Sequence, residues 1–127
     1  MNMLFRITKG SLLLLALSAG CNNDKSSSTP SASTFSCTYK KAGELTLCTQ
    51  YQELTGSTLT SIQSECELRG SEGYSWAVAA CPASTIGSCS LDATSQKPAP
   101  STQFYYGSFG SQGTAAGMCE AQRGTFN

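Results

Sequence analysis

The chain has 127 residues, a formal net charge of zero and no histidine. Charged residues make up 13% of it, and the basic ones form no cluster of the kind that nucleic acid or anionic lipid attracts. Without histidine the chain lacks the commonest general base and any Ser-His-Asp or Cys-His arrangement. We therefore expect no nucleic-acid partner and no catalytic site that uses histidine.

The first 20 residues have the order of a secretory signal peptide. Arg6 and Lys9 precede an apolar segment at residues 12–17, and small residues follow at 18–20. The apolar segment is much shorter than the roughly 20 residues that span a bilayer. We expect a cleaved leader, whose loss leaves six basic and eight acidic residues and a mature net charge of about −2.

The small residues lead directly into a cysteine, because residues 19–21 read Ala-Gly-Cys. This segment resembles the lipobox of bacterial lipoproteins, although Ser18 stands where that motif prefers leucine and Leu17 lies one place early. The resemblance implies that Cys21 becomes the N-terminus and carries lipid, and two or more acyl chains hold a protein stably on a membrane. A plain secreted protein is the alternative.

The residue after this cysteine bears on the destination of the lipoprotein. Asn22 is not the aspartate that retains some lipoproteins at the inner membrane. The resemblance therefore implies the outer membrane or the cell surface rather than the inner membrane.

Residues 21–35 are dominated by Ser, Thr, Asn and Pro. Such a segment buries too little apolar surface to offset the entropy lost on ordering. We expect a tether, and about 14 flexible residues typically span roughly 20 Å. The folded domain is then expected at residues 36–127, held away from the lipid headgroups.

Six cysteines remain once Cys21 is assigned to lipid: Cys37, Cys48, Cys66, Cys81, Cys89 and Cys119. An even number in an exported chain indicates three disulfides, which a small domain with a modest core needs for stability. There is no Cys-x-x-Cys pair, and the spacings fit no zinc site. We expect neither a metal nor a cofactor.

The elements expected along the domain are short. Strands are expected where aromatic residues, threonine and β-branched residues gather, at 35–39, 44–52, 74–81, 86–91 and 102–109. One helix is expected around 59–69, with Thr60 and Gln63 as a capping box and Leu59, Ile62 and Cys66 on its inner face. A second helix is expected to place Ala115, Met118 and Cys119 on one face.

The two helical segments end in similar sequences, ECELRG at 65–70 and MCEAQRG at 118–124. Each follows a turn rich in Gly, Ser and Thr, and tyrosines precede each turn. The pattern predicts a small disulfide-rich α+β domain of two related β-β-α halves. Each half holds three cysteines, so at least one disulfide must join the halves into one body.

The pairing of the cysteines stays open among fifteen possibilities. Cys37 and Cys48 are equidistant from an expected turn at Ala42 and Gly43. Residues 81 and 89 similarly flank one loop, CPASTIGSC. We prefer the pairs 37–48, 81–89 and 66–119 over the alternative 37–81, 48–66 and 89–119.

Candidate functional residues are few. Trp76, Tyr105, Tyr106 and Phe109 are a possible binding surface, with core packing as the alternative role for these aromatic side chains. The carboxylates Glu44, Glu53, Glu65, Glu67, Glu72, Asp92 and Glu120 read as solvated charges, and no catalytic residue is indicated.

These observations favour a membrane-anchored lipoprotein that acts as a non-catalytic binding or structural module of the cell envelope. Its expected partners are membrane lipid, through acylated Cys21, and an unidentified envelope or extracellular ligand. One alternative is a protease-inhibitor-like or host-protein-binding module, because a loop closed by an 81–89 disulfide would be rigid and exposed. Another is a small envelope hydrolase, which would need two converging carboxylates.

Overall fold

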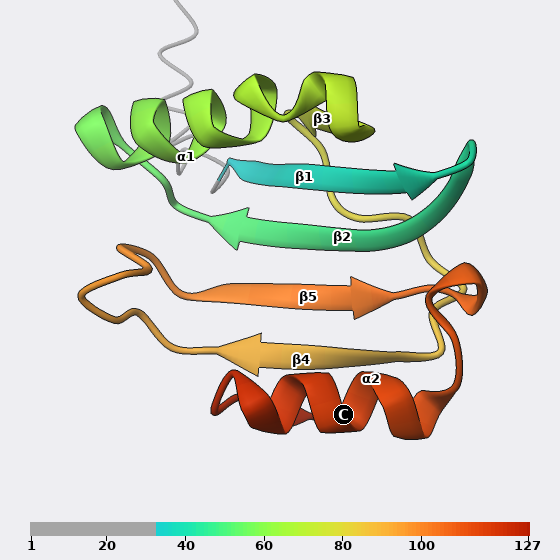
Figure 1. Cartoon of the computed structure of the whole chain (residues 1–127). Helices are drawn as coiled ribbons and strands as arrows, with labels where there is room; N and C mark the ends of the chain where they lie inside the picture. Colours follow the sequence, from blue (N-terminus) through green and yellow to red (C-terminus); the bar gives the residue numbers. More distant parts are fainter. Residues whose placement is uncertain (1–32) are drawn as a thin grey trace, which may run out of the picture.

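A six-stranded antiparallel sheet carries two helices and three disulfides in the computed structural model, which describes residues 33–127 (Figure 1). The domain is therefore α+β, as the sequence predicts. The signal peptide, Cys21 and the tether up to residue 32 lie outside the described residues. Within residues 33–127, no helix is long and apolar enough to cross a membrane.

The elements follow one another in the order β1 (Thr34–Lys41), β2 (Glu44–Gln52), α1 (Gly56–Leu68), η1 (Gly70–Glu72), β3 (Tyr74–Ala77), β4 (Gly87–Leu91), β5 (Ser101–Tyr105), η2 (Gly107–Phe109), α2 (Gln112–Ala121) and β6 (Thr125–Phe126). β1 begins two residues inside the expected tether, because Phe35 is buried in the core. β3 and β5 end earlier than expected, and β6 is an element that the sequence did not indicate.

The strand order in the sheet is β3-β1-β2-β5-β4-β6. The first three strands lie on one side, the last three on the other, and the two groups meet where β2 pairs with β5. Thr49 pairs with Gln103 at this junction. Moving outward from this pair, β2, β1 and β3 follow on one side, and β5, β4 and β6 follow on the other. The pairing pattern therefore has an approximate two-fold symmetry.

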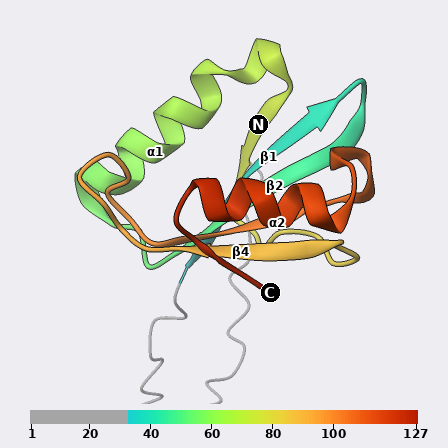
Figure 2. The same ribbon diagram turned by 60° about the horizontal axis from the view of Figure 1, so that its bottom comes forward.

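Both helices cover the same face of the sheet (Figure 2). Disulfides join Cys37 in β1 to Cys66 in α1 and Cys89 in β4 to Cys119 in α2. Cys37 pairs with Thr49 and Cys89 pairs with Gln103. Directly paired residues project from the same face of a sheet, so both disulfides, and with them both helices, lie on one side.

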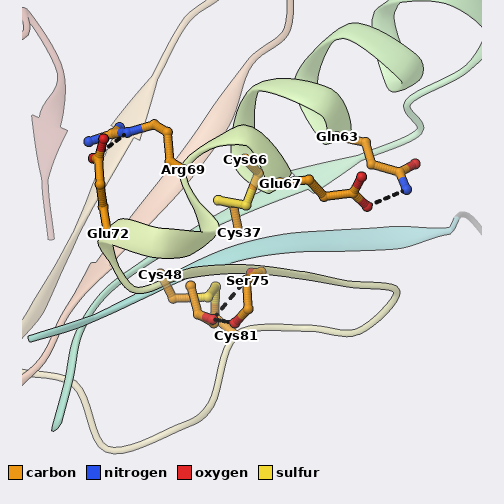
Figure 3. The surroundings of a disulfide bond; sticks show 10 residues. Cys37, Cys48, Gln63, Cys66, Glu67, Arg69, Glu72, Ser75 and Cys81 are labelled. Carbon is orange, nitrogen blue, oxygen red and sulfur yellow. Dashed lines mark hydrogen bonds and ion pairs between the residues drawn. A yellow bond between two sulfur atoms is a disulfide. The ribbon is translucent and has the colours of Figure 1, made fainter. Parts of the chain in front are cut away.

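The third disulfide lies on the opposite face. Cys48 in β2 bonds to Cys81, which belongs to the connection between β3 and β4 at residues 78–86. The Cys81 amide also donates to Gln50 Oε1 at 2.9 Å, and the Tyr106 hydroxyl donates to the Pro82 carbonyl at 2.7 Å. Figure 3 shows Cys37–Cys66 beside α1 and Cys48–Cys81 on the other side of the strands.

The disulfide pairs correct the preferred expectation. All three preferred pairs, 37–48, 81–89 and 66–119, are wrong, and of the alternative set only 89–119 occurs. Residues 81 and 89 do not close a loop, because Cys81 bonds to Cys48 and Cys89 to Cys119. One disulfide, Cys48–Cys81, joins the two groups of three cysteines, as the odd number in each group requires.

The helix starts differ from the expectation in one respect. α1 begins at Gly56 after Thr55, and the expected capping box is wrong because Thr60 Oγ1 donates to the Gly56 carbonyl within the helix. α2 follows Ser111, whose hydroxyl accepts a hydrogen bond from the Thr114 amide at 3.2 Å. Each helix buries its cysteine on the inner face as predicted, with Ile62 in α1 and Ala115 in α2, but Met118, expected on the same face as Cys119, is 47% exposed.

The core consists of two clusters, one beneath each helix. Beneath α1 the buried residues are Phe35, Leu54, Ile62 and Ala99. Beneath α2 they are Cys89, Leu91, Tyr105, Ala115 and Cys119. Because each helix covers only its own cluster, the central strands β2 and β5 have no helix directly over their junction.

Candidate binding groove

The helix-bearing face has an open cavity of about 490 Å³ between α1 and α2, which is within the size range of small-molecule sites. We call it the interhelical groove. Its floor is formed by Leu47, Thr49, Tyr51, Ser101, Gln103 and Tyr105, from β2 and β5. Its sides are formed by Ile62, Glu65, Cys66 and Arg69 near α1, by Met118 and Gln122 near α2, and by Phe109, Tyr74 and residues 96–99 at the ends.

The two sides of the groove are built in the same way. Arg69 and Gln122 each follow the last turn of their helix, and each backbone amide donates to the carbonyl of the disulfide cysteine three residues earlier. Counted from these cysteines, Glu65 on α1 corresponds to Met118 on α2, since each lies one residue before its cysteine. The groove therefore has a charged side and an apolar side at equivalent positions.

One end of the groove is bridged by the connection between β4 and β5, residues 92–100. The equivalent connection between β1 and β2 is only a tight turn at Ala42 and Gly43, both with positive φ. In the longer connection, Ala99 is buried beneath α1, while Lys97 Nζ donates to Gln122 Oε1 at 2.8 Å on the α2 side. Figure 2 shows this segment reaching from the sheet toward the start of α1.

A chain of hydrogen bonds crosses the groove floor from this connection. Gln122 Nε2 donates to Gln103 Oε1 at 3.0 Å, and the Tyr105 hydroxyl donates to the same oxygen at 3.0 Å. With the Lys97 contact, the chain links a cation, two amides and a phenol. These polar side chains are thus held in fixed positions on the floor and one side of the groove.

The charges around the groove are distributed unevenly. Arg69 Nε lies 3.1 Å from Glu72 Oε2 (Figure 3), and the guanidinium lies over the Tyr74 ring at 3.8 Å, so Arg69 already has two partners. Across the floor, burial and the neighbouring Glu65 carboxylate together raise the pKa of the Tyr51 phenol. The Tyr51 phenol therefore stays protonated, and can donate a hydrogen bond, at a higher pH than an ordinary tyrosine.

The four aromatic residues predicted as a binding surface do not form one. Tyr105 is 1% exposed and Tyr106 is 7% exposed, because both pack in the interior. Trp76 packs against the cluster beneath α1. Only Tyr105 and Phe109 reach the groove, where their rings meet edge to face at 4.7 Å.

The groove residues that sequence reasoning missed are mostly polar: Thr49, Lys97, Gln103 and Gln122. None belongs to a motif, and β2, β5, α2 and the 92–100 connection bring them together from distant parts of the chain. One signal was present for Tyr51, because tyrosines precede the Gly/Ser/Thr-rich turn in both repeats.

Glu65 is the single carboxylate among the residues that line the groove, whereas glycoside hydrolysis uses a pair. Among the described residues, no three His, Cys, Asp or Glu side chains are placed to hold a metal ion.

A comparison with known protein families, with curated proteins and with solved structures finds no match for this chain.

Proposed function

We propose that this chain is an exported, lipid-anchored binding module of the cell envelope, and that the interhelical groove is its ligand site. The three disulfides indicate an oxidising, extracytoplasmic location. The resemblance of residues 19–21 to a lipobox supports attachment through lipidated Cys21. The outer membrane or cell surface is the proposed destination, because Asn22 is not an inner-membrane retention signal.

The single observation that carries the binding function is the open groove itself. A small domain stabilises itself by covering the apolar face of its sheet, yet here about 490 Å³ stays open over the two central strands. The floor of this space combines apolar side chains, such as Leu47, with polar ones that hold one another in place by hydrogen bonds. Concave sites with a few fixed polar groups and apolar walls are typical of ligand binding.

The other functions considered from the sequence have less support. An inhibitor-like loop would need an 81–89 disulfide, and Cys81 instead ties its segment to β2. A carboxylate-based hydrolase would need a second acid near Glu65, and the groove lining supplies none.

We also infer that the two halves arose by duplication of a β-β-α-β unit. Each half has the same element order, and in each half a disulfide joins the first strand to the helix. The last strand of each unit places an aromatic residue opposite the strand cysteine, Trp76 opposite Cys37 and Phe126 opposite Cys89. The groove then lies where the two units meet.

The anchor is tested on protein extracted from the membranes of the producing cell. Mass spectrometry should find a chain that begins at Cys21 and carries diacylglycerol, and the Cys21→Ser variant should be recovered in the soluble fraction. A membrane-extracted chain that retains residues 1–20 without lipid would contradict the proposed anchor.

The groove is tested with a blocked variant and a matched control. Thr49→Trp places an indole on the groove floor, and Thr102→Trp places one on the opposite face of the neighbouring strand. We expect small-molecule fragments to shift the NMR signals of groove residues in the parent protein and in Thr102→Trp, but not in Thr49→Trp. Fragment binding that Thr49→Trp leaves unchanged would contradict a ligand site in the groove.

A further inference from the structure

The orientation of the amides on the groove floor is fixed by Lys97. An ammonium group has only donors, so the oxygen of the Gln122 amide must face Lys97 Nζ, at 2.8 Å. The nitrogen of the same amide then faces Gln103 and donates to its Oε1. Gln122 and Tyr105 both contact the oxygen of the Gln103 amide, so the nitrogen of that amide lies on the side away from them.

The Gln103 amide nitrogen has no acceptor among the described residues. Its oxygen accepts two hydrogen bonds, from Gln122 and from Tyr105, while its two N–H groups make none. Among the described residues that are not exposed, every fully buried side-chain nitrogen or oxygen has a hydrogen-bond partner. The Gln103 nitrogen has no partner, so it is not fully buried. Because Gln103 is half-buried and lines the groove, its amide nitrogen is accessible from the groove space.

Lys97 presents further donors beside this amide. Its ammonium uses one N–H on Gln122 and has two more. Lys97 and Gln103 both hydrogen-bond to the one side chain of Gln122, so they lie on either side of a single amide group. The groove therefore offers a cation and a neutral N–H donor on opposite sides of the Gln122 amide, both without an anionic partner among the described residues.

The other side chains that line the groove limit the chemistry of the rest of the ligand. Met118 is 47% exposed and Phe109 is half-buried, so together with the Tyr51 ring they provide apolar contacts. Glu65 on the α1 side repels a second negative charge and accepts hydrogen bonds from a hydroxyl or an amine. The lining favours one anionic group on the Lys97 side and an uncharged or cationic donor toward α1.

We propose that the interhelical groove binds a small molecule with a single carboxylate, which accepts hydrogen bonds from Lys97 Nζ, while Gln103 Nε2 donates to a second acceptor of the same molecule. This inference rests on the proposed function of the groove as a ligand site and names the chemical class of its ligand. A carboxylate suits Lys97 because its two oxygens can accept from the two N–H groups that the ammonium has left, and charge-assisted hydrogen bonds are about twice as strong as neutral ones.

The test compares carboxylates with their neutral counterparts on the ¹⁵N-labelled mature chain, with its disulfides intact and Cys21→Ser to avoid the lipid. The probes are 4-hydroxyphenylacetate against 4-hydroxyphenylacetamide, and glucuronate against glucose, each at millimolar concentration. We expect the two carboxylates to shift the side-chain NH₂ signals of Gln103 and Gln122. The neutral counterparts should bind at least about tenfold more weakly, because one charge-assisted hydrogen bond is worth roughly that factor.

Two variants assign the effect to the proposed groups. Lys97→Gln should weaken carboxylate binding about tenfold, and Gln103→Glu should also weaken it, since an acceptor then replaces the N–H donor while Tyr105 and Gln122 keep the acceptor that they contact. Lys41→Gln, in the exposed end of β1, should leave binding unchanged. The backbone NMR spectrum of each variant reports whether the fold is kept.

The outcomes separate the two proposals. Binding of the neutral probes to the groove with no preference for carboxylates overturns the ligand class and leaves the proposed function in place. Carboxylate binding that Lys97→Gln does not weaken also overturns the inference. If no probe of either kind shifts a groove residue, both the ligand class and the groove as a ligand site are overturned.

Discussion

Cys48 lies opposite Thr38, and not opposite Cys37, in the ladder between β1 and β2. The register shifts by one residue between Tyr39 and Lys40, where Thr46 is the extra residue on β2. A shift of one residue turns every later side chain to the other face of the sheet. Cys37 therefore faces α1, Cys48 faces the β3–β4 connection, and the two cannot bond to each other.

This bulge is held by contacts that are distant in sequence. Thr46 Oγ1 lies 3.0 Å from Ser108 Oγ, and the Thr46 carbonyl accepts from the Tyr106 amide at 3.2 Å. Ser108 Oγ in turn donates to the Leu45 carbonyl at 2.6 Å. The segment that follows β5 thus stabilises the irregular register, which decides the disulfide pairing.

The first prediction concerns the disulfides. Non-reducing digestion should yield the linked pairs 37–66, 48–81 and 89–119. Replacing Cys48 and Cys81 together by alanine should lower the free energy of unfolding by about 3–4 kcal/mol, as expected for a loop of this length. Urea denaturation measures the loss.

The matched control for this prediction is the double replacement Cys37→Ala and Cys66→Ala. Its sequence separation of 29 is close to the 33 of the first pair, so chain entropy predicts nearly the same loss for both. A peptide that links 37 to 48, or a Cys48–Cys81 replacement that leaves stability unchanged, would contradict the described topology.

The sequence allowed the local elements to be predicted but not their long-range partners. The turn at Ala42 and Gly43, both helices and most strand positions follow from local patterns, and these predictions are confirmed. The one-residue bulge at Thr46 could not be foreseen, because Ser108 and Tyr106 hold it from the other half of the chain. A hairpin register predicted without this bulge places every cysteine beyond it on the wrong face of the sheet.

The groove was hidden from the sequence for a related reason. Its floor is formed by Thr49 and Gln103, which are paired only because β2 and β5 meet at the centre of the sheet. The repeated pattern indicated two halves but not how their strands join. Lys97 lies in a connection that has no long counterpart in the first half, so comparing the repeats gave no reason to select it.

The second prediction contrasts two glycines at the C-terminal end of the chain. A Cβ at Gly124 would lie 2.7 Å from Leu91 Cδ2 and 2.8 Å from the Ser90 carbonyl oxygen, and would also press on the sulfur of Cys89. Gly124→Ala should therefore destabilise the domain by about 1–3 kcal/mol. Thermal unfolding monitored by circular dichroism measures the change.

Gly117 is the control for this substitution, because it lies within α2 and a Cβ added there would meet no atom within 4 Å outside the helix's own backbone. Gly117→Ala should stabilise the helix by about 0.5–1 kcal/mol, since alanine loses less conformational entropy there. Equal effects of the two alanines would show that Gly124 does not pack against β4 as described.

The third prediction compares the two helix N-caps. Ser111 accepts a hydrogen bond from the Thr114 amide at the start of α2, while Thr55 at the start of α1 makes no side-chain cap bond. Ser111→Ala should lower the free energy of unfolding by about 1 kcal/mol, and Thr55→Ala by only a few tenths. A loss at Thr55 that equals the loss at Ser111, measured by urea denaturation, would contradict this difference in capping.

The fourth prediction concerns alkaline stability. Burial raises the pKa of Tyr105 and of Tyr106, and burial together with the Glu65 charge raises that of Tyr51. A tyrosine whose pKa is higher in the folded than in the unfolded state stabilises the fold fully below its unfolded value of about 10. This contribution is lost as the pH rises through the folded pKa, so stability should fall steeply above about pH 10.

A pair of glutamates on α1 separates the two causes at Tyr51. In Glu65→Gln the charge is removed while the burial remains, so the pKa of Tyr51 should fall but stay above its ordinary value. Glu67→Gln should leave it unchanged, because Glu67 is exposed and hydrogen-bonds to Gln63. NMR titration of ¹³C-labelled tyrosine rings resolves each phenol. If Tyr51 ionises at the same pH in Glu65→Gln as in the parent protein, Glu65 does not act on the groove floor.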